Sequence, residues 1–237
     1  MATLKGKKAL VLGGSRGIGA AVVERLVAEG AEAAFTYAGS KEAASALAAK
    51  TKAKAVQADS ADREAVAKVI AGQGPLDILV VNAGVAVVGD PLELDPAEID
   101  RLIDVNVRSP YHAAVETARK MPDGGRIIVI GSVNGDRMPF PGLAAYALSK
   151  SAVQGLVRGL ARDLGPRGIT VNNVQPGPVD TDMNPADGPM KETMHSVMAI
   201  KRHGRPSEIA ALVAFLAGPE AGYITGAQHT IDGGFGA

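Results

Sequence analysis

A tyrosine and a lysine stand four residues apart in Tyr-Ala-Leu-Ser-Lys, residues 146–150, in a stretch otherwise built of small and apolar residues. On a helix this spacing places Tyr146 and Lys150 on one face, one turn apart, so the ammonium can approach the phenol. A phenol ordinarily titrates near pH 10, and a neighbouring ammonium favours its ionised form. The pair is a candidate for proton transfer, and the alternative is a solvated helix face.

Ser132 is the third candidate, because it closes the strand-like segment Arg-Ile-Ile-Val-Ile-Gly-Ser. In open parallel sheets, ligands bind beyond the carboxyl ends of the strands. We therefore expect the Ser132 hydroxyl to face the cleft in which a ligand binds.

The elements that must position these side chains follow a β-α rhythm. Short β-branched segments alternate with longer ones rich in Ala, Leu and Glu, and the strand-like segments cover residues 9–14, 33–37, 54–59, 77–84, 126–132, 169–177 and 227–232. These segments are apolar along their length, as expected when helices cover both faces of a parallel sheet. The pattern predicts one doubly wound α/β domain over residues 1–237, with a parallel seven-stranded sheet and helices on both faces.

Composition excludes several classes of function. The chain has 25 Lys plus Arg and 25 Asp plus Glu, so no overall field favours nucleic acid or an anionic membrane. It has no cysteine, which excludes disulfides and thiolate metal sites. With no apolar run long enough for a membrane span or a signal peptide, we expect a cytoplasmic protein.

The first βα turn contains Gly13, Gly17 and Gly19, where backbone N–H groups can approach a phosphate. Their spacing differs from the fingerprint G-x-G-x-x-G. It resembles the Thr-Gly-x-x-x-Gly-x-Gly turn of the short-chain dehydrogenase/reductase family, with Leu12 in place of the threonine, which removes a bracing hydroxyl. The resemblance covers essentially the whole chain and implies a Rossmann-type domain.

The family resemblance implies residues that bind a dinucleotide cofactor. Val81-Asn82-Ala83-Gly84 resembles the family's Asn-Asn-Ala-Gly segment, with one local hydrogen bond lost at Val81. Asp59 resembles the aspartate that meets the adenine ring, although an N-cap role for the next helix is the alternative. The other implied residues are Gly13, Ser15, Arg16, Gly17, Ile18 and Gly19 at the phosphates, Tyr146 and Lys150 at the nicotinamide ribose, and Pro176, Gly177, Val179 and Thr181 at the nicotinamide.

The second strand-like segment favours NADP(H) over NAD(H). An NAD site commonly ends this strand with an acid that binds the ribose 2′-hydroxyl, whereas this chain has Tyr37 there. Arg16, Ser40 and Lys41 can bind a 2′-phosphate instead. For Lys41 the alternative is a solvated residue in the first turn of a helix.

The family resemblance also implies a catalytic set. Ser132 would hold the substrate oxygen, Tyr146 would exchange a proton with it, and Lys150 would support the tyrosine and the ribose. Asn106 matches the family's helix asparagine, and Pro110 four residues later lacks the N–H that would bond its carbonyl. That carbonyl could hold a water in a proton path, and the alternative is a kinked helix without a relay.

The substrate side is predicted from residues after the sixth strand. Residues 178–203 carry Met183, Met190, Met194 and Met198 with several prolines, which is typical of a mobile lid that admits apolar ligands. Met138 and Phe140 are candidates for the opposite wall, with ordinary packing as the alternative. His195 and His203 lack further ligands, so we expect no metal. The substrate is expected to be a carbonyl compound or secondary alcohol, and the family layout implies a homotetramer.

Further segments, including Leu-Gly-Gly-Ser-Arg-Gly-Ile-Gly and Met-Ala-Ile-Lys-Arg-His-Gly, resemble a bacterial family member that binds cyclic-di-GMP in biofilm dispersal. That resemblance implies a regulatory or sequestering role beside or instead of turnover. Arg158 and Arg162, four residues apart, are candidates for gripping a phosphate, and a solvated helix surface is the alternative. The glycine-rich turn beside Arg16 is a second candidate, in competition with NADP(H).

Overall fold

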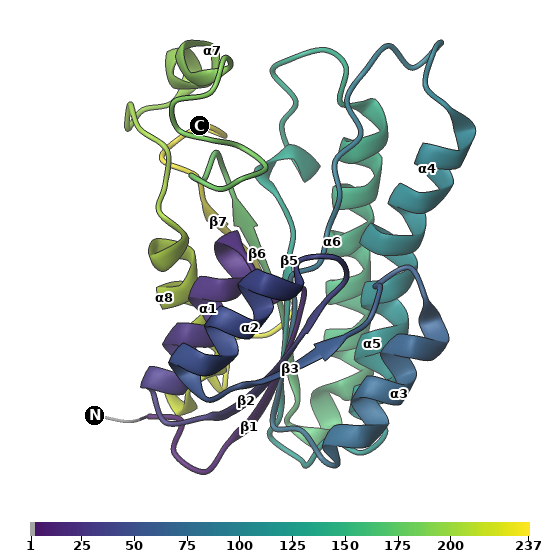
Figure 1. Ribbon diagram of the computed structural model, residues 1–237, viewed down its shortest axis with the longest axis vertical. Helices are drawn as coiled ribbons and strands as arrows, with labels where there is room; N and C mark the ends of the chain where they lie inside the picture. Colours follow the sequence, from purple (N-terminus) through teal and green to yellow (C-terminus); the bar gives the residue numbers. More distant parts are fainter. Residues whose placement is uncertain (1–2) are drawn as a thin grey trace.

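The computed structural model describes residues 3–237 and contains one parallel sheet of seven strands. The strand order is β3-β2-β1-β4-β5-β6-β7 (Figure 1). The strands are β1 Lys8–Leu12, β2 Glu32–Tyr37, β3 Lys54–Gln57, β4 Ile78–Val81, β5 Arg126–Ile130, β6 Thr170–Pro176 and β7 Gln228–Ile231. The prediction of a doubly wound α/β domain with seven parallel strands is confirmed.

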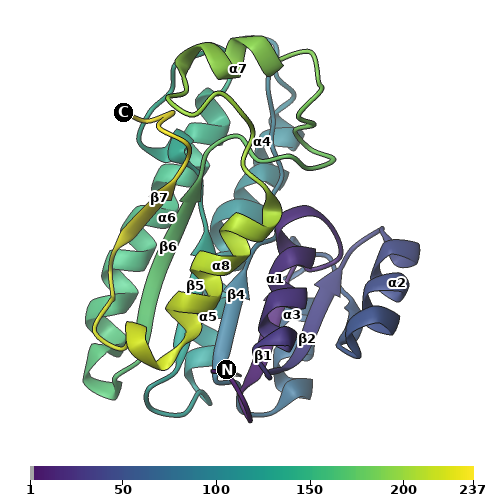
Figure 2. The ribbon, with the colours of Figure 1, turned by 90° about the vertical axis from the view of Figure 1, so that its left-hand side faces the viewer.

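Helices cover both faces of the sheet, with α1, α2 and α8 on one side and α3, α4, α5 and α6 on the other (Figures 1 and 2). The helices are α1 Gly17–Ala28, α2 Lys41–Thr51, α3 Arg63–Gln73, α4 Pro96–Ile103, α5 Ser109–Ala118, α6 Ala144–Leu164, α7 Lys191–Val197 and α8 Pro206–Ala217. In residues 3–237 we find no helix with the length and apolar character needed to cross a membrane.

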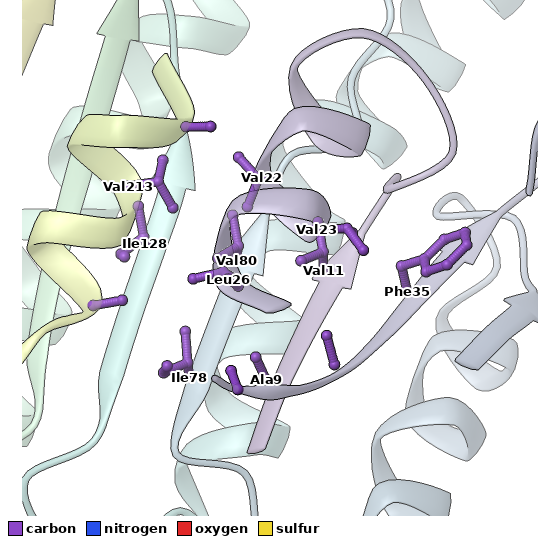
Figure 3. Close-up of a cluster of buried hydrophobic side chains, with 14 of the residues drawn as sticks. Ala9, Val11, Val22, Val23, Leu26, Phe35, Ile78, Val80, Ile128 and Val213 are labelled. Carbon is purple, nitrogen blue, oxygen red and sulfur yellow. The ribbon is translucent and has the colours of Figure 1, made fainter. Parts of the chain in front are cut away.

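The inner strands are apolar along their length because successive side chains enter different cores. In β1, Ala9 and Val11 belong to the core under α1 and α8, whereas Leu10 and Leu12 belong to the core under α3, α5 and α6. Figure 3 shows part of the first core, where Val22 of α1 and Val213 of α8 lie beside strand side chains such as Val80. Because both faces of these strands are buried, a strand cannot shift along its neighbours, and its carboxyl end keeps its position at the edge of the sheet.

The strand order reverses between β1 and β4, because the chain builds β2 and β3 on one side of β1 before it returns. In doubly wound sheets, the ligand cleft opens at such a reversal, beyond the carboxyl ends of the strands. Helix α7 lies over this end of the molecule (Figures 1 and 2).

Between α4 and α5 the chain forms a π-helical turn, Asp104–Arg108, which contains Asn106. Pro110, near the start of α5, has no N–H to donate to the preceding turn, and the N–H of Ser109 bonds instead to the carbonyl of Asp104, five residues back. The predicted irregularity at Asn106 is confirmed, whereas a water relay through its carbonyl stays a prediction.

Substitution of Phe35 in β2 would test the packing that supports the turn between β1 and α1. Its side chain is fully buried, and a Cβ placed on Gly14 would lie 2.5 Å from the Phe35 Cβ. We expect Phe35→Ala to lower the free energy of unfolding by about 3–5 kcal/mol, because it opens a cavity in a close-packed core. Urea unfolding measures this loss.

The control is Leu92→Ala, since the Leu92 side chain is 91% exposed. Its loss should stay within about 0.5 kcal/mol. Equal losses for the two variants would contradict the packing described here.

Candidate active site

The turn between β1 and α1 is built from glycines with two different tasks. Gly13 and Gly17 have φ of +75° and +52°, in the left-handed region that favours glycine. Gly19 has ordinary φ, but a Cβ there would lie 2.1 Å from the Gly13 carbonyl oxygen. The first two glycines shape the turn, and the third lets α1 pack against it.

The hydroxyl that Leu12 cannot supply comes from Thr36 of β2. The Gly13 N–H donates to Thr36 Oγ1 at 2.9 Å, and the Gly14 N–H donates to the Thr36 carbonyl at 2.9 Å. The sequence interpretation missed Thr36, although a polar residue inside the apolar run Ala-Ala-Phe-Thr-Tyr was a signal. Directly after β4, Asn82 Nδ2 donates to the Gly13 carbonyl at 2.7 Å, so the turn is braced from the sides of both neighbouring strands.

A cavity of about 480 Å³ runs along the carboxyl ends of the strands. It brings together most of the residues expected at a cofactor and substrate: Gly13, Ser15, Arg16, Gly17, Ile18, Tyr37, Ser40, Asp59, Asn82, Ala83, Gly84, Ser132, Tyr146, Lys150, Pro176, Gly177, Val179 and Thr181. Three residues of the predicted cofactor and catalytic sets do not line it: Gly19, Lys41 and Asn106. Lys41 is exposed in the first turn of α2, which matches its solvated alternative.

The cavity wall also contains charged residues that the sequence interpretation missed. Arg16 pairs with Asp182, 3.1 Å away and 166 positions later in the chain. Arg101 pairs with Asp59 at 3.0 Å, and the Ala61 N–H donates to the other Asp59 oxygen at 3.0 Å. The Ala61 hydrogen bond, followed by Arg101, holds the pKa of Asp59 below its usual range.

The N-cap alternative for Asp59 is wrong. The residue that caps α3 is Asp62, whose carboxylate accepts the N–H of Ala65 at 3.0 Å. Asp59 remains free of that task and lies on the cavity wall with Arg101.

Ser132, Tyr146 and Lys150 lie on the same cavity. Ser132 follows β5, and its Oγ accepts the Asn134 N–H at 3.1 Å. Tyr146 and Lys150 occupy the first two turns of α6, and Lys150 Nζ lies 5.7 Å from the centre of the tyrosine ring. Lys150 Nζ donates to the Ile130 carbonyl at 3.1 Å, which fixes the ammonium below the end of β5.

Burial sets the pKa values of this pair in opposite directions. It raises the pKa of Tyr146, against a smaller lowering by the hydrogen bond with Ser132. It lowers the pKa of Lys150 to about 8. The expectation that a neighbouring ammonium and the oxidised nicotinamide together favour the phenolate stays a prediction, because burial is the larger influence on the pKa of Tyr146 in the protein alone.

Asn106 lies behind the cavity and connects two of its walls. Its Nδ2 donates to the Val85 carbonyl at 2.8 Å and to Ser149 Oγ at 3.0 Å, and its Oδ1 accepts the Val85 N–H at 2.9 Å. Ser149 Oγ donates in turn to the Tyr146 carbonyl at 2.8 Å. The amide therefore ties the segment after β4 to the turn that carries Tyr146.

The methionines of residues 178–203 have different environments. Met183 and Met194 line the cavity, and Met190 is exposed. Met198 is buried against Val133 and Phe235, so for this residue the prediction of a lid lining is wrong. Its position in the small core anchors the end of the segment.

Two aromatic rings complete the substrate end. Phe140 lines the cavity, as one sequence alternative expected, and meets Phe235 edge to face with ring centres 6.1 Å apart. Met138 is not part of the lining, and its sulfur accepts from Asn134 Nδ2 at 3.4 Å. The sequence interpretation missed Phe235.

His195 and His203 bond to each other through Nε2 and Nδ1, 2.9 Å apart. Across the part of the chain that the structure describes, no three His, Cys, Asp or Glu side chains gather in an arrangement that could hold a metal ion. Arg158 and Arg162 are exposed on α6 and are not part of the cavity lining.

Comparison with known proteins identifies the family. Residues 13–236 match the family model described as enoyl-(acyl carrier protein) reductase, a short-chain dehydrogenase/reductase domain. The chain belongs to the short-chain dehydrogenase/reductase family, as its sequence resemblance indicated.

Relatives span the full chain. The cyclic-di-GMP-binding biofilm dispersal mediator protein of Escherichia coli strain K12 is 65% identical over 237 residues, which cover 100% of both chains. A 3-oxoacyl-[acyl-carrier-protein] reductase of Staphylococcus aureus strain Mu50 is 39% identical, with 96% of this chain and 97% of the relative covered. The crystal structure of BdcA in complex with NADPH superposes with a TM-score of 0.98 and 66% identity, covering 99% of this chain and 96% of that one.

The lowered pKa of Lys150 predicts a pH-dependent stability. Between about pH 8 and the ordinary lysine pKa of 10.5, the unfolded chain keeps the Lys150 proton that the folded chain has lost. Stability therefore rises with pH across this window, by on the order of 3 kcal/mol. Lys150→Met should lack the rise in urea unfolding measured at the two ends of the window.

The matched control is Lys41→Met, which removes an exposed lysine outside the cavity. It should follow the wild-type profile. A parallel profile for Lys150→Met and the wild type would contradict a buried ammonium at Lys150.

Proposed function

We propose that this protein is an NADP(H)-dependent reductase of carbonyl compounds, or dehydrogenase of secondary alcohols. The observation that carries the proposal is the placement of Ser132, Tyr146 and Lys150 on the same cavity as the glycine-rich turn. A hydroxyl, a phenol and an ammonium at one such cavity form an acid-base system without a metal. The reductases among the relatives support this class of reaction.

The cavity fits a dinucleotide. At Gly13 a Cβ would lie 2.7 Å from the Ala83 Cα, so only glycine lets the turn pack this closely against the segment after β4. The same turn lines the cavity and leads into the N-terminus of α1, which favours a phosphate. Gly13, Ser15, Arg16, Gly17 and Ile18 would hold the phosphates, and Pro176, Gly177, Val179 and Thr181 would hold the nicotinamide. When bound, the nicotinamide supplies or accepts the hydride.

The end of β2 favours a 2′-phosphate on the adenosine ribose. Tyr37 and Ser40 line the cavity there with Arg16, and the strand ends without the acid that commonly binds a free 2′-hydroxyl. BdcA, the neighbour with 66% identity, was crystallised with NADPH, which supports the same preference.

In the reducing direction, the carbonyl carbon gains the hydride and its oxygen gains a proton, so that an alcohol forms. Tyr146 is the donor of that proton, because its raised pKa keeps the phenol protonated near neutrality. Ser132 orients the carbonyl oxygen. Lys150 holds the ribose and, when charged, stabilises the phenolate that remains.

The substrate end favours an apolar carbonyl compound. Its walls combine Phe140, Leu143, Met183, Met194 and Phe235 with few charges. Thioether side chains adapt to irregular apolar shapes, so the pocket can admit several related substrates.

Tyr146→Phe tests the proton transfer. The variant keeps the ring but loses the acidic hydroxyl, so kcat for NADPH-dependent carbonyl reduction should fall by about 10²- to 10⁴-fold with little change in NADPH affinity. The assay follows the loss of NADPH absorbance over a panel of apolar aldehydes and ketones.

The control is Tyr111→Phe, a half-exposed tyrosine of α5 outside the cavity. It should keep full activity. A fully active Tyr146→Phe, with loss confined to Ser132→Ala, would overturn the assignment of the proton donor.

Asp182→Asn tests the cofactor half of the proposal. Asp182 competes with the cofactor phosphates for Arg16 and adds negative charge to the cavity wall. An exposed pair contributes about 0.2–1 kcal/mol, so its removal should tighten NADPH binding by up to about fivefold at low salt, and less at high salt. Calorimetric titration measures the change.

Asp187→Asn is the matched control, because it removes an exposed acid of the same segment that does not line the cavity. Its NADPH affinity should equal that of the wild type. Weaker NADPH binding by Asp182→Asn would place Arg16 away from the phosphates.

A second candidate function is that of a cyclic-di-GMP-binding regulator of biofilm dispersal. The name of the 65% identical E. coli relative favours it. Calorimetric titration with cyclic-di-GMP, in the absence and presence of NADPH, tests it. Mutual exclusion would support a shared cavity, and the absence of any cyclic-di-GMP binding would remove this candidate.

A further inference from the structure

A second hollow of about 770 Å³ lies on the other side of the segment that covers the active-site cavity. Asp180 lines this hollow, whereas its chain neighbours Val179 and Thr181 line the cavity. Helix α7 is divided in the same way, with Met194 on the cavity and Lys191 and His195, one turn apart, on the hollow. Residues 179–195 thus form one wall between two pockets. We call the second pocket the basic hollow.

The basic hollow is rich in cations. Its lining has four basic side chains, two histidines and two carboxylates, and the basic groups and histidines are Lys191, Lys201, Arg202, Arg205, His195 and His203. Glu208 forms two hydrogen bonds with Arg202, at 2.9 and 2.7 Å, and thereby balances one cation. Three cations then face Asp180 and Glu192, so the local charge is positive in a chain whose formal net charge is zero.

His203 is a buried histidine on the lining of the hollow. Its side chain is only 5% exposed, and its Nδ1 bonds to His195, but its buried Nε2 has no hydrogen-bond partner among residues 3–237. A buried polar nitrogen without a partner costs free energy. Neither the proton transfer nor the cofactor site uses this histidine pair.

We propose that the basic hollow binds a phosphate or phosphodiester anion, at a site separate from the active-site cavity. Arginine and lysine donors around a concave surface are the groups that recognise phosphate oxygens. The proposal stands independently of the reductase activity, since it uses none of the residues at the active-site cavity.

The bound anion would act on the same groups that hold the covering segment. Lys201 Nζ donates to the carbonyls of His195 and Ser196 at 2.8 and 3.1 Å and so fixes the end of α7. An anion that draws Lys191 and Lys201 together would stiffen α7 and, with it, Met194 on the cavity side. Binding in the hollow and binding in the cavity are therefore expected to be coupled.

The test is calorimetric titration of the full chain, saturated with NADPH, with pyrophosphate and with cyclic-di-GMP at low ionic strength. The variant is the double substitution Lys191→Gln with Arg205→Gln. These side chains are suitable because both are exposed and each makes a single ion pair, at 3.8 Å. We expect one anion site per chain in the wild type and at least about tenfold weaker binding in the variant.

The matched control is Arg158→Gln with Arg162→Gln, which removes two exposed cations of α6 that line neither pocket. It should bind the anion like the wild type. Tighter binding of cyclic-di-GMP than of pyrophosphate identifies a dinucleotide ligand, whereas equal binding identifies a free phosphate compound. Unchanged NADPH affinity in the Lys191 and Arg205 variant shows that it is folded.

Three results would overturn the proposal: no binding of either probe, loss of anion binding on saturation with NADPH, or equal weakening in both double variants. Should the Lys191 and Arg205 variant fail to fold, hydrogen exchange of the wild type replaces it. Pyrophosphate or cyclic-di-GMP should then slow exchange in residues 191–205, and unchanged exchange there would refute the site. If the protein binds the anion but reduces no carbonyl compound, the proposed function is refuted and the proposal of an anion site in the basic hollow stands.

Discussion

The close approach of two backbone segments controls the geometry of the active-site cavity. The turn after β1 and the segment after β4 meet with no room for a Cβ at Gly13, and Asn82 joins them through its bond to the Gly13 carbonyl. Both strands are buried on both faces, so neither can slide to relieve a larger side chain. The glycine-rich turn is thus held by the core rather than by its own loop.

The residues proposed for catalysis depend on the same core in a different way. Lys150 is buried, and its hydrogen bond to Ile130 fixes the ammonium at the end of β5, which β4 separates from the strand that leads into the glycine turn. The pKa of Lys150 is lowered because burial makes a charged ammonium less stable at this position. A lysine with a pKa of about 8 can change its charge near neutral pH, which would suit the role in proton transfer proposed for Lys150.

The spacing of residues within single segments predicted much of this site, whereas contacts between segments far apart in the sequence could not be predicted from it. Tyr146 and Lys150 share one helix, and the strand ends could be located from apolar segments bounded by glycines, so the fold and the cavity lining were largely predictable. The Arg16–Asp182 pair and the Thr36 brace join segments whose contact only the packed sheet creates. Asp59 and Asp62 show why a helix N-cap is hard to predict from sequence. Both precede α3, and only the backbone geometry makes Asp62 the capping residue.

The segment over the cavity has two sides, one on the cavity and one on the basic hollow. Val179 is buried toward the cavity while Asp180 beside it is exposed, and the anchor of Met198 in the small core limits how far α7 can move. Because residues 179–195 contribute to the lining of both pockets, a change in their position on binding in one pocket would alter the other, which is how the proposed coupling would operate. By thermodynamic reciprocity, an anion that tightens NADPH binding must itself bind more tightly to the NADPH complex. An anion that weakens NADPH binding must bind more weakly to that complex.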